Sequence, residues 1–253
     1  MLPFAAVPEA SRGLMVESRR RSARLGRRLR RLFVLLLSAW ILSSAGLVLL
    51  LRWVDRPVSA VMLQRLAGEG APQRQEWVDI EQIDPSMALA VVAAEDQRFP
   101  DHWGFDTTEI IAAVERHLDG ERLRGASTIS QQVARNLFLW QGRSFLRKGL
   151  EVWFTGLIEL AWPKRRILEM YLNFAETGER LFGVAVASRH YFREGPGRLG
   201  RHKAALLAAV LPNPLVYRVD NPSAFVVKRR DWILQQMDNL GGPSYLNRIM
   251  RGD

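Results

Sequence analysis

The sequence predicts a mainly α-helical domain of about 180 residues that follows a single membrane-spanning helix. Residues 32–51 form an apolar run that contains no charged residue. Beyond this run, apolar residues recur at helical spacing, and strand-like patterns are confined to residues 77–80 and a short stretch at 215–219. With 253 residues, 48% of them hydrophobic, the chain can bury one good core. A mainly α fold is therefore expected.

The first 31 residues form a basic arm that we expect to lie in the cytoplasm. They hold nine Arg and two Glu residues, a balance of +7 within a net charge of +10. The positive-inside rule places such a flank on the cytoplasmic side of a membrane. Nucleic acid is an alternative partner, but the arm has no interleaved aromatic residues and adjoins the apolar run. Anionic lipid headgroups are therefore the expected partner, and nucleic acid is not.

The apolar run predicts a transmembrane helix over residues 32–52. Twenty residues at about 1.5 Å each span roughly 30 Å, the thickness of a bilayer core. A cleaved signal peptide is the alternative, but its apolar core is usually only about 7–15 residues long, and no clean small-residue cleavage site precedes Arg52. We therefore expect an uncleaved anchor, a membrane-proximal linker over 53–75 and an extracytoplasmic domain over 76–253.

Helix start and stop signals divide the remaining chain into a series of helices. In the linker, Val58, Met62 and Leu66 recur every four residues and predict a short amphipathic helix. Asp84 and Pro85 predict the start of an apolar helix that runs to about residue 97. Further helices are predicted at about 108–118, 128–138, 144–162, 163–173, 183–191, 203–211, 222–237 and 243–250.

Hydroxyl-bearing residues are the expected caps of two of these helices. Thr107 or Thr108 stands at the start of the helix over 108–118, and Ser127 or Thr128 at the start of the helix that ends near 138. Together with Arg124, the second helix start makes an anion site suited to phosphate, since a helix N-terminus carries partial positive charge. Ordinary capping is the alternative explanation of the same residues.

Two apolar segments have two possible explanations. Residues 137–140 are Leu-Phe-Leu-Trp, and Trp153 and Phe154 follow further along the chain. An exposed patch of this kind beside an anchor would enter the membrane surface. Packing in the core explains the same pattern, because apolar periodicity alone does not separate the two.

Composition excludes several kinds of chemistry. The chain has no cysteine, so it has neither a disulfide framework nor a thiolate nucleophile. Histidine occurs only at positions 102, 117, 190 and 202, and no pair has the spacing of metal ligands. No Ser is followed three residues later by Lys, so the acyl-serine signature of penicillin-binding transpeptidases is missing from this sequence.

Residues 95–106 concentrate polar chemistry directly after an apolar helix. Glu95 ends this helix, and partial desolvation there raises the pKa of a carboxyl group and makes it a usable base. A solvated polar helix end is the alternative. The neighbouring Asp96, Arg98, His102 and Asp106 are expected to position the loop rather than to transfer protons.

Five segments together resemble a known family. In chain order they are EDQRFPDHWGFD (95–106), GASTISQQ (125–132), RKGLE (147–151), RRILEMYLN (165–173) and FGVAVASRHYF (182–192). Their order and spacing resemble the five signatures of the peptidoglycan glycosyltransferases, glycosyltransferase family 51, in their monofunctional form. The resemblance covers roughly residues 76–235 plus the anchor. It implies a lysozyme-like, two-lobed domain that polymerises lipid II into β-1,4-linked glycan strands by inverting displacement of undecaprenyl pyrophosphate.

The resemblance also implies roles for individual residues. Glu95 matches the general base of the first signature, and Glu151 matches the second essential carboxylate. The residues that match substrate-binding positions are Arg124, Ser127, Gln131, Gln132, Arg147 and Lys148. Arg135 stands where the family commonly has Lys, which keeps the charge and changes the geometry. Lys203 stands where Glu is common, so a structural ion pair of the family is in doubt here.

The implied reaction explains why these residue types are needed. The acceptor hydroxyl needs a base in the transition state, and basic groups stabilise the leaving pyrophosphate. No cofactor is required with certainty, although Mg²⁺ or Mn²⁺ could share this work, with Glu95 as the candidate ligand. For Arg147 and Glu151, an ordinary ion pair one helical turn apart is the alternative.

The resemblance implies partners, a location and two rival functions. The partners are lipid II, the growing lipid-linked glycan and the bacterial inner membrane, with division or elongation proteins as further candidates. The catalytic domain would lie in the periplasm. One rival is a lytic transglycosylase or lysozyme-like hydrolase, which also uses a Glu at a helix end. The other is a catalytically inactive scaffold for wall synthesis.

Overall fold

The computed structural model describes residues 9–69, 74–118, 127–142 and 144–251, with side chains from Leu25 onward. The chain divides into two compact units, Met1–Leu47 and Val48–Asp253, and each is described by itself.

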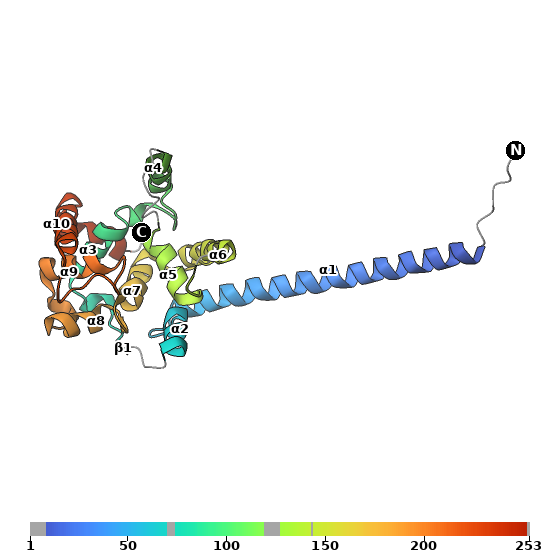
Figure 1. Cartoon of the computed structure of the whole chain (residues 1–253), viewed down its shortest axis with the longest axis horizontal. Helices are drawn as coiled ribbons and strands as arrows, with labels where there is room; N and C mark the ends of the chain where they lie inside the picture. The colour runs from blue at the N-terminus through green and yellow to red at the C-terminus, as the bar shows by residue number, and fades with distance from the viewer. Residues whose placement is uncertain (1–8, 70–73, 119–126, 143, 252–253) are drawn as a thin grey trace. The chain divides into compact units, whose positions relative to one another are not determined.

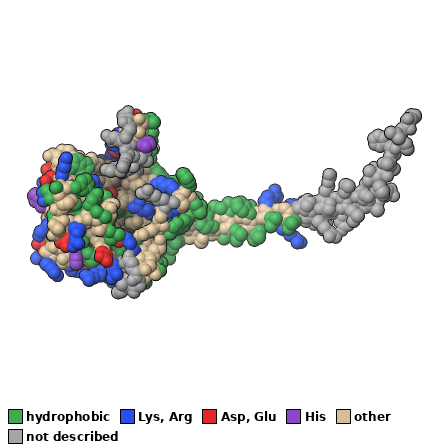
Figure 2. Space-filling model, in the orientation of Figure 1, with side chains coloured by type: hydrophobic (Ala, Val, Ile, Leu, Met, Phe, Trp, Pro, Cys, Tyr) green, Lys and Arg blue, Asp and Glu red, His purple; other side chains and the backbone are tan. Residues whose placement is uncertain are grey.

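The first unit consists of most of one long helix, α1 (Glu9–Leu51). Its segment Leu25–Leu51 is the one helix in the described part of the chain that is long and apolar enough to cross a bilayer. Most of its apolar side chains are exposed, and Figure 2 shows hydrophobic side chains along this part of the helix. A helix that is apolar and exposed over this length fits a single-pass membrane protein.

The second unit is built from helices and one small sheet (Figure 1). Its α-helices are α2 (Ala60–Glu69), α3 (Pro85–Glu95), α4 (Thr107–Leu118), α5 (Ile129–Phe138), α6 (Phe145–Ala161), α7 (Lys164–Phe174), α8 (Val184–Ala187), α9 (Gly200–Val210), α10 (Ala224–Asn239) and α11 (Asn247–Met250). The strands β1 (Arg74–Gln75), β2 (Glu176–Gly178) and β3 (Leu181–Phe182) pair in the order β1-β3-β2. Strand β1 is parallel to β3, and β2 is antiparallel to it. The prediction of a mainly α fold is confirmed.

Helix α3 lies in the centre of the second unit and has no polar face. All seven residues from Met87 to Ala93 are buried, and α9 and α10 pack against the helix. A helix that is apolar on all sides is stable only when it is surrounded by protein. The predicted start is confirmed, because Pro85 opens the helix and Asp84 caps it by accepting a hydrogen bond from the Ser86 amide at 2.8 Å. The sequence thus carries Glu95 through the core and delivers it at the helix end.

The capping predictions have two outcomes. Thr128 is the cap of α5, as expected. At α4 the prediction was wrong, because Asp106 fills this role in place of Thr107 or Thr108. Its Oδ1 accepts hydrogen bonds from the amides of Thr108 at 3.0 Å and Glu109 at 3.1 Å. A carboxylate also interacts favourably with the positive end of a helix, so Asp106 provides the stronger cap.

The predicted strand-like segments do not enter the sheet. Residues 77–79 are extended, but Val78 exchanges two 2.9 Å hydrogen bonds with the side-chain amide of Asn173, and the Ile80 amide donates to Glu169 at 3.0 Å. Side chains of α7 therefore take the place of a partner strand. Residues 215–219 form turns, with the amides of Val216 and Tyr217 bonded to the Asn213 carbonyl. The strands that form the sheet are too short for an alternating apolar and polar pattern to show in the sequence.

The apolar segment at 137–140 is mainly core. Leu137 and Leu139 are buried, and Phe138 stacks on Phe154 with ring centroids 4.4 Å apart. Trp140 remains exposed. Helices α4 and α6 carry a larger set of exposed apolar side chains: Ile110, Ile111, Val114, Leu118, Phe145, Leu146, Val152 and Leu160.

The last turn of α1 belongs to the second unit, where it contacts residues from the junction between the end of α6 and the start of α7. The indole Nε1 of Trp162 donates to the Val48 carbonyl at 2.7 Å. Arg166 donates through Nη2 to the Leu51 carbonyl at 3.2 Å and forms an ion pair through Nη1 with Asp55 at 2.7 Å. These bonds satisfy carbonyl groups that a helix end leaves without intrahelical partners, and the guanidinium complements the negative end of the helix.

Candidate active site

Glu95, the last residue of α3, contacts polar side chains from two other helices. Its Oε2 accepts a 3.0 Å hydrogen bond from Nε2 of Gln132 on α5. Its Oε1 lies 3.3 Å from Nη2 of Arg229 on α10. The Glu95 side chain is only 13% exposed. Three helices that are distant in sequence therefore meet at this carboxylate.

The surroundings of Glu95 make it a stronger base than an exposed glutamate. Burial raises the pKa of the Glu95 carboxyl, and the nearby negative charge of Asp96 also raises it. The Gln132 hydrogen bond and the charges of Arg229 and Arg135 act in the opposite direction, but the pKa remains above its ordinary value. Desolvation is the largest of these effects, because burial removes the water that would otherwise stabilise the charged carboxylate.

A tyrosine fixes the orientation of the Gln132 amide. The hydroxyl of Tyr171 on α7 donates to Oε1 of Gln132 at 3.3 Å, so the NH₂ end of the amide must face Glu95. Tyr171 is buried, and burial raises its pKa well above the ordinary value, which keeps the hydroxyl protonated as a donor. Tyr171, Gln132 and Glu95 thus form a directed chain of hydrogen bonds.

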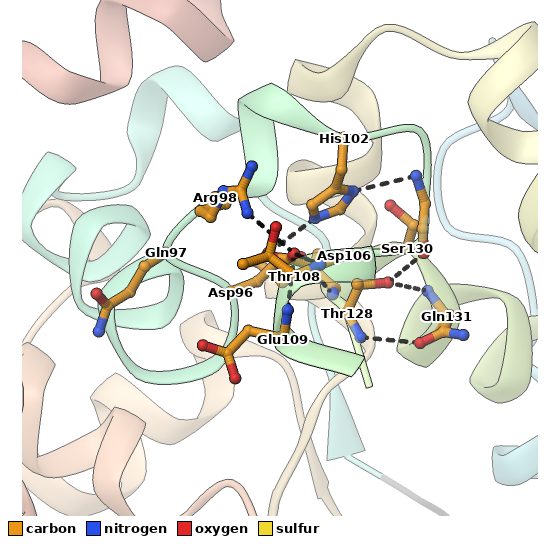
Figure 3. A network of polar contacts seen from close by, with 12 residues as sticks. Asp96, Gln97, Arg98, His102, Asp106, Thr108, Glu109, Thr128, Ser130 and Gln131 are labelled. Carbon is orange, nitrogen blue, oxygen red and sulfur yellow. Dashed lines mark hydrogen bonds and ion pairs between the residues drawn. The ribbon is translucent and has the colours of Figure 1, made fainter. Parts of the chain in front are cut away.

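The loop after Glu95 is held by a buried network around Asp96 (Figure 3). Oδ1 of Asp96 lies 2.8 Å from Nε2 of His102, and Oδ2 accepts from the Ile129 amide at 3.0 Å. Nδ1 of His102 accepts from the Gly104 amide at 3.1 Å, so the ring proton that faces Asp96 is on Nε2. Asp96 therefore joins the end of α3, the loop and the start of α5. This geometry agrees with the expectation that Asp96 and His102 position the loop.

Gln131, one of the predicted substrate-binding residues, helps to cap the start of α5. Gln131 and Thr128 form a reciprocal capping box, with bonds of 3.0 Å from the Thr128 amide to Gln131 and 3.2 Å from the Gln131 amide to Thr128. The Gln131 side chain is buried and engaged there. Ser127 lies partly exposed beside it, whereas Arg124 lies outside the described residues. A substrate contact for Gln131 or Ser127 stays a prediction.

Two cavities flank the pair formed by Glu95 and Gln132. A cavity of about 330 Å³ is lined by Glu95, Ser127 and Trp232, among other residues. A second cavity, of about 210 Å³, is lined by Gln132 and Arg135, together with Tyr171. Hydrogen-bonded neighbours thus face two different spaces.

A second polar group lies on α6. Both oxygens of Glu151 are ion-paired, with Arg147 Nη1 at 3.0 Å and Lys148 Nζ at 2.5 Å. The Glu151 side chain is 2% exposed, and within the described residues Nε of Arg147 is buried without a hydrogen-bond partner. The three residues predicted from the third signature therefore lie together, and the ion pair between Arg147 and Glu151 that was the alternative explanation of their spacing is present. No contact among the described residues joins this group directly to Glu95.

Sequence reasoning missed Arg229 and Tyr171. Arg229 lies one helical turn from the buried residues Val226 and Ile233, so a charged residue on an apolar helix face was the available signal. Tyr171 stands in a run of buried residues within the fourth signature, where a phenol needs a polar partner. Both side chains reach the site from helices far along the chain, which a local pattern does not reveal.

The donor set around Glu95 does not suit a resident metal ion. Glu95 faces an amide NH₂ group and a guanidinium, and Asp96 is engaged by His102 and Ile129. Cations such as Mg²⁺ prefer several oxygen ligands. Across the described ranges, no three His, Asp or Glu residues group closely enough to hold a metal ion.

Lys203, another departure from the family pattern, is ion-paired in this structure. Its Nζ contacts Oε1 of Glu194 at 2.5 Å. Lys203 thus has a carboxylate partner from the segment between η3 (Ser188–Phe192) and α9.

Comparison with known proteins identifies the family. The family model described as "Transglycosylase" matches residues 61–238. The chain is 52% identical over 216 residues to the biosynthetic peptidoglycan transglycosylase of Stutzerimonas stutzeri, covering 83% of this chain and 89% of the relative. It is 51% identical over 210 residues to the protein of the same name from Pseudomonas fluorescens, covering 81% and 88%. The recognised resemblance and the prediction of an enzyme of this class are confirmed, and the chain belongs to the transglycosylase family.

Proposed function

We propose that this chain polymerises lipid II into β-1,4-linked glycan strands, with Glu95 as the general base. The observation that carries the proposal is the desolvated Glu95, held by Gln132 beside a cavity in a chain of the transglycosylase family. The names of its relatives, biosynthetic peptidoglycan transglycosylases, support a peptidoglycan substrate.

The reaction is one inverting displacement. The acceptor 4-hydroxyl oxygen attacks the anomeric carbon of the donor sugar, and its proton passes to Glu95. The bond to the undecaprenyl pyrophosphate breaks at the same time, and the leaving group takes the electron pair. Glu95 then returns the proton to solvent. Because the pKa of Glu95 is raised, the carboxylate accepts the hydroxyl proton more readily than an exposed glutamate would.

Cationic side chains are proposed to stabilise the leaving pyrophosphate. Arg135 lines the cavity on the Gln132 side, which suits a donor site. Arg147 and Lys148 are both held in place by Glu151, which fixes two further cationic groups on α6. Arg124 belongs to the same proposed group. Charge that develops in the transition state is stabilised most by groups that are already in position.

The apolar surface and α1 support a membrane location for the reaction. We infer a single span with a cytoplasmic N-terminus, an inner-membrane location and a periplasmic catalytic unit, following the basic arm of residues 1–31. Exposed apolar residues of α4 and α6, such as Leu118 and Phe145, suit contact with lipid. The lipid tails of lipid II and of the growing glycan would remain there. Contacts with division or elongation proteins stay a prediction.

The test is polymerisation of purified lipid II by the full-length chain, with and without EDTA. Glycan strands are expected from the unmodified chain, and Glu95→Gln is expected to lose about 10³-fold in rate. Glu109→Gln is the matched control, because Glu109 lines the same cavity and is expected to lose less than about threefold. Retention of the fold is checked by circular dichroism.

Three results would overturn the proposal. Cleavage of preformed sacculi without polymerisation would indicate a lytic transglycosylase or hydrolase. Absence of both activities in the unmodified chain would indicate a scaffold. Unchanged polymerisation by Glu95→Gln would remove Glu95 from the role of base.

A further inference from the structure

A cavity with no role in the chemistry above lies beside the proposed donor site. It has a volume of about 790 Å³ and is lined by residues from the β2–β3 hairpin, strand β1, helix α2, η3 and the 214–220 loop. Its charged and aromatic lining residues are Arg65, Arg74, Arg180, Arg218, Glu179, Asp220, His190, Tyr191 and Tyr217. Four arginines against two carboxylates make this lining basic. The volume is that of a site for a small ligand or a short peptide.

The basic cavity and the cavity with Arg135 are neighbours. Pro214 lines both of them. Arg65 lines the basic cavity, Glu176 lines the other, and the two side chains form an ion pair with both carboxylate oxygens 3.1 Å from Nη2. A substrate held at Arg135 could therefore extend across this ion pair into the basic cavity.

The wall of the basic cavity is well defined. The Tyr191 hydroxyl donates to the Thr177 carbonyl at 3.2 Å and lies directly over Gly178. A Cβ atom at residue 178 would come within 2.2 Å of this hydroxyl, so the close approach requires glycine. The Arg74 amide bonds to the Arg180 carbonyl at 2.9 Å, which holds the backbones of these two arginines together where the parallel strands β1 and β3 begin.

The charges of the lining leave capacity for an anionic ligand. Arg218 is paired with Asp220 at 2.7 Å, and Arg65 is paired with Glu176. For the Arg74 guanidinium, no carboxylate among the described residues lies within ion-pair distance. Arginine binds carboxylates in a planar, two-pronged geometry. Leu181, Pro214 and Leu215 add apolar groups to the lining of the cavity.

We propose that the basic cavity binds the carboxylate-bearing stem peptide of the substrate while its pyrophosphate lies near Arg135. Arginines spread around a wide, partly apolar cavity fit a chain with several separated carboxylates better than one compact phosphate. The stem peptide is attached to the same sugar as the pyrophosphate, so it must leave the donor site through a neighbouring space. This inference rests on the proposed function.

The test compares two substrates and two variants of the full-length chain in non-ionic detergent. The substrates are lipid II with its complete peptide and lipid II whose peptide has been removed. The variant Arg74→Gln/Arg180→Gln removes two charges from the cavity. The control Arg198→Gln/Arg251→Gln removes two exposed charges that do not line it.

The unmodified chain is expected to show about a tenfold lower KM for complete lipid II than for the trimmed substrate. The cavity variant should raise KM about tenfold for complete lipid II only, with kcat unchanged, and the control should match the unmodified chain. Equal KM values for both substrates in every variant would overturn the inference.

A second arm adds anionic phospholipid. If the cavity variant changed turnover only in its presence, and equally for both substrates, the cavity would bind a lipid headgroup and the proposal would fail. If the unmodified chain polymerised neither substrate, the proposed function itself would fail, which is a different result.

Discussion

Glu95 and Glu151 both carry largely buried carboxylates, Glu95 at the end of α3 and Glu151 within α6, yet their surroundings differ. Glu95 has an amide donor at 3.0 Å and one guanidinium at 3.3 Å, whereas Glu151 contacts two cations directly, at 3.0 and 2.5 Å. The first carboxylate is desolvated with little compensation and has a raised pKa. The second is neutralised by its neighbours. The same functional group therefore suits proton transfer in one place and the fixing of cations in the other.

Apart from the loss of the proposed base itself, the largest effect expected from this contrast follows from Glu151→Gln. Arg147 and Lys148 would lose their common anchor, and we expect kcat/KM for lipid II to fall about 100-fold. The free energy of unfolding should also fall by about 1–3 kcal/mol, because Arg147 would stay buried without its carboxylate. Steady-state kinetics and thermal unfolding in detergent measure the two effects.

Glu159→Gln is the matched control on the same helix. Glu159 is also buried and ion-paired, with Lys164 at 2.8 Å. The Glu159→Gln variant should lower the free energy of unfolding without a comparable fall in kcat/KM for lipid II. If both variants changed kinetics alike, Glu151 would have only a structural role.

A smaller effect is expected from Tyr171→Phe. Without the hydroxyl, the Gln132 amide loses its orienting donor, and its bond to Glu95 weakens. Since this bond lowers the pKa of Glu95, the acid limb of the kcat/KM profile should move to higher pH, and kcat should fall about three- to tenfold.

Tyr245→Phe provides the comparison for that shift. The Tyr245 hydroxyl donates to the Gln97 carbonyl at 2.6 Å near the same helix end but does not contact Gln132. Its removal should leave the acid limb in place. An identical shift in both variants would mean that loosening of the helix end, and not orientation of Gln132, sets the pKa.

The smallest effect concerns stability. Because the pKa of Glu95 is higher in the folded than in the unfolded chain, its contribution to stability is present at low pH and is lost as pH rises through the folded pKa. Relative to the unmodified chain, Glu95→Gln should therefore be more stable at pH 7 than at pH 4. Thermal unfolding at both pH values measures this, and Glu151→Gln should show the opposite sign at pH 7.

Local signals predicted much of the fold and part of the site. The Asp84–Pro85 start, the apolar run behind Glu95 and the Thr128 cap depend on residues a few positions apart, and a sequence displays such patterns directly. The contacts between Glu95 and Arg229 depend on the packing of α10 against α3, which no short pattern encodes.

The two errors have different origins. Residues 77–80 look like a strand, but their hydrogen bonds go to Asn173 and Glu169, about 90 residues away in the chain. Tertiary contacts therefore decide their structure. Thr107 and Thr108 are acceptable caps, but Asp106 stands one position earlier and interacts more strongly with the helix end. There the stronger of two local signals decides.

The hydrogen bonds from Trp162 and Arg166 to the end of α1 have a consequence for exchanging the anchor. The compact second unit starts at Val48, inside the apolar run, so the last turn of α1 is also the first structural element of the second unit. A foreign membrane helix could replace residues up to 47 without changing these contacts. A junction placed after residue 52 would also replace the residues that Trp162 and Arg166 contact. The exchangeable part of this protein therefore ends before its hydrophobic segment does.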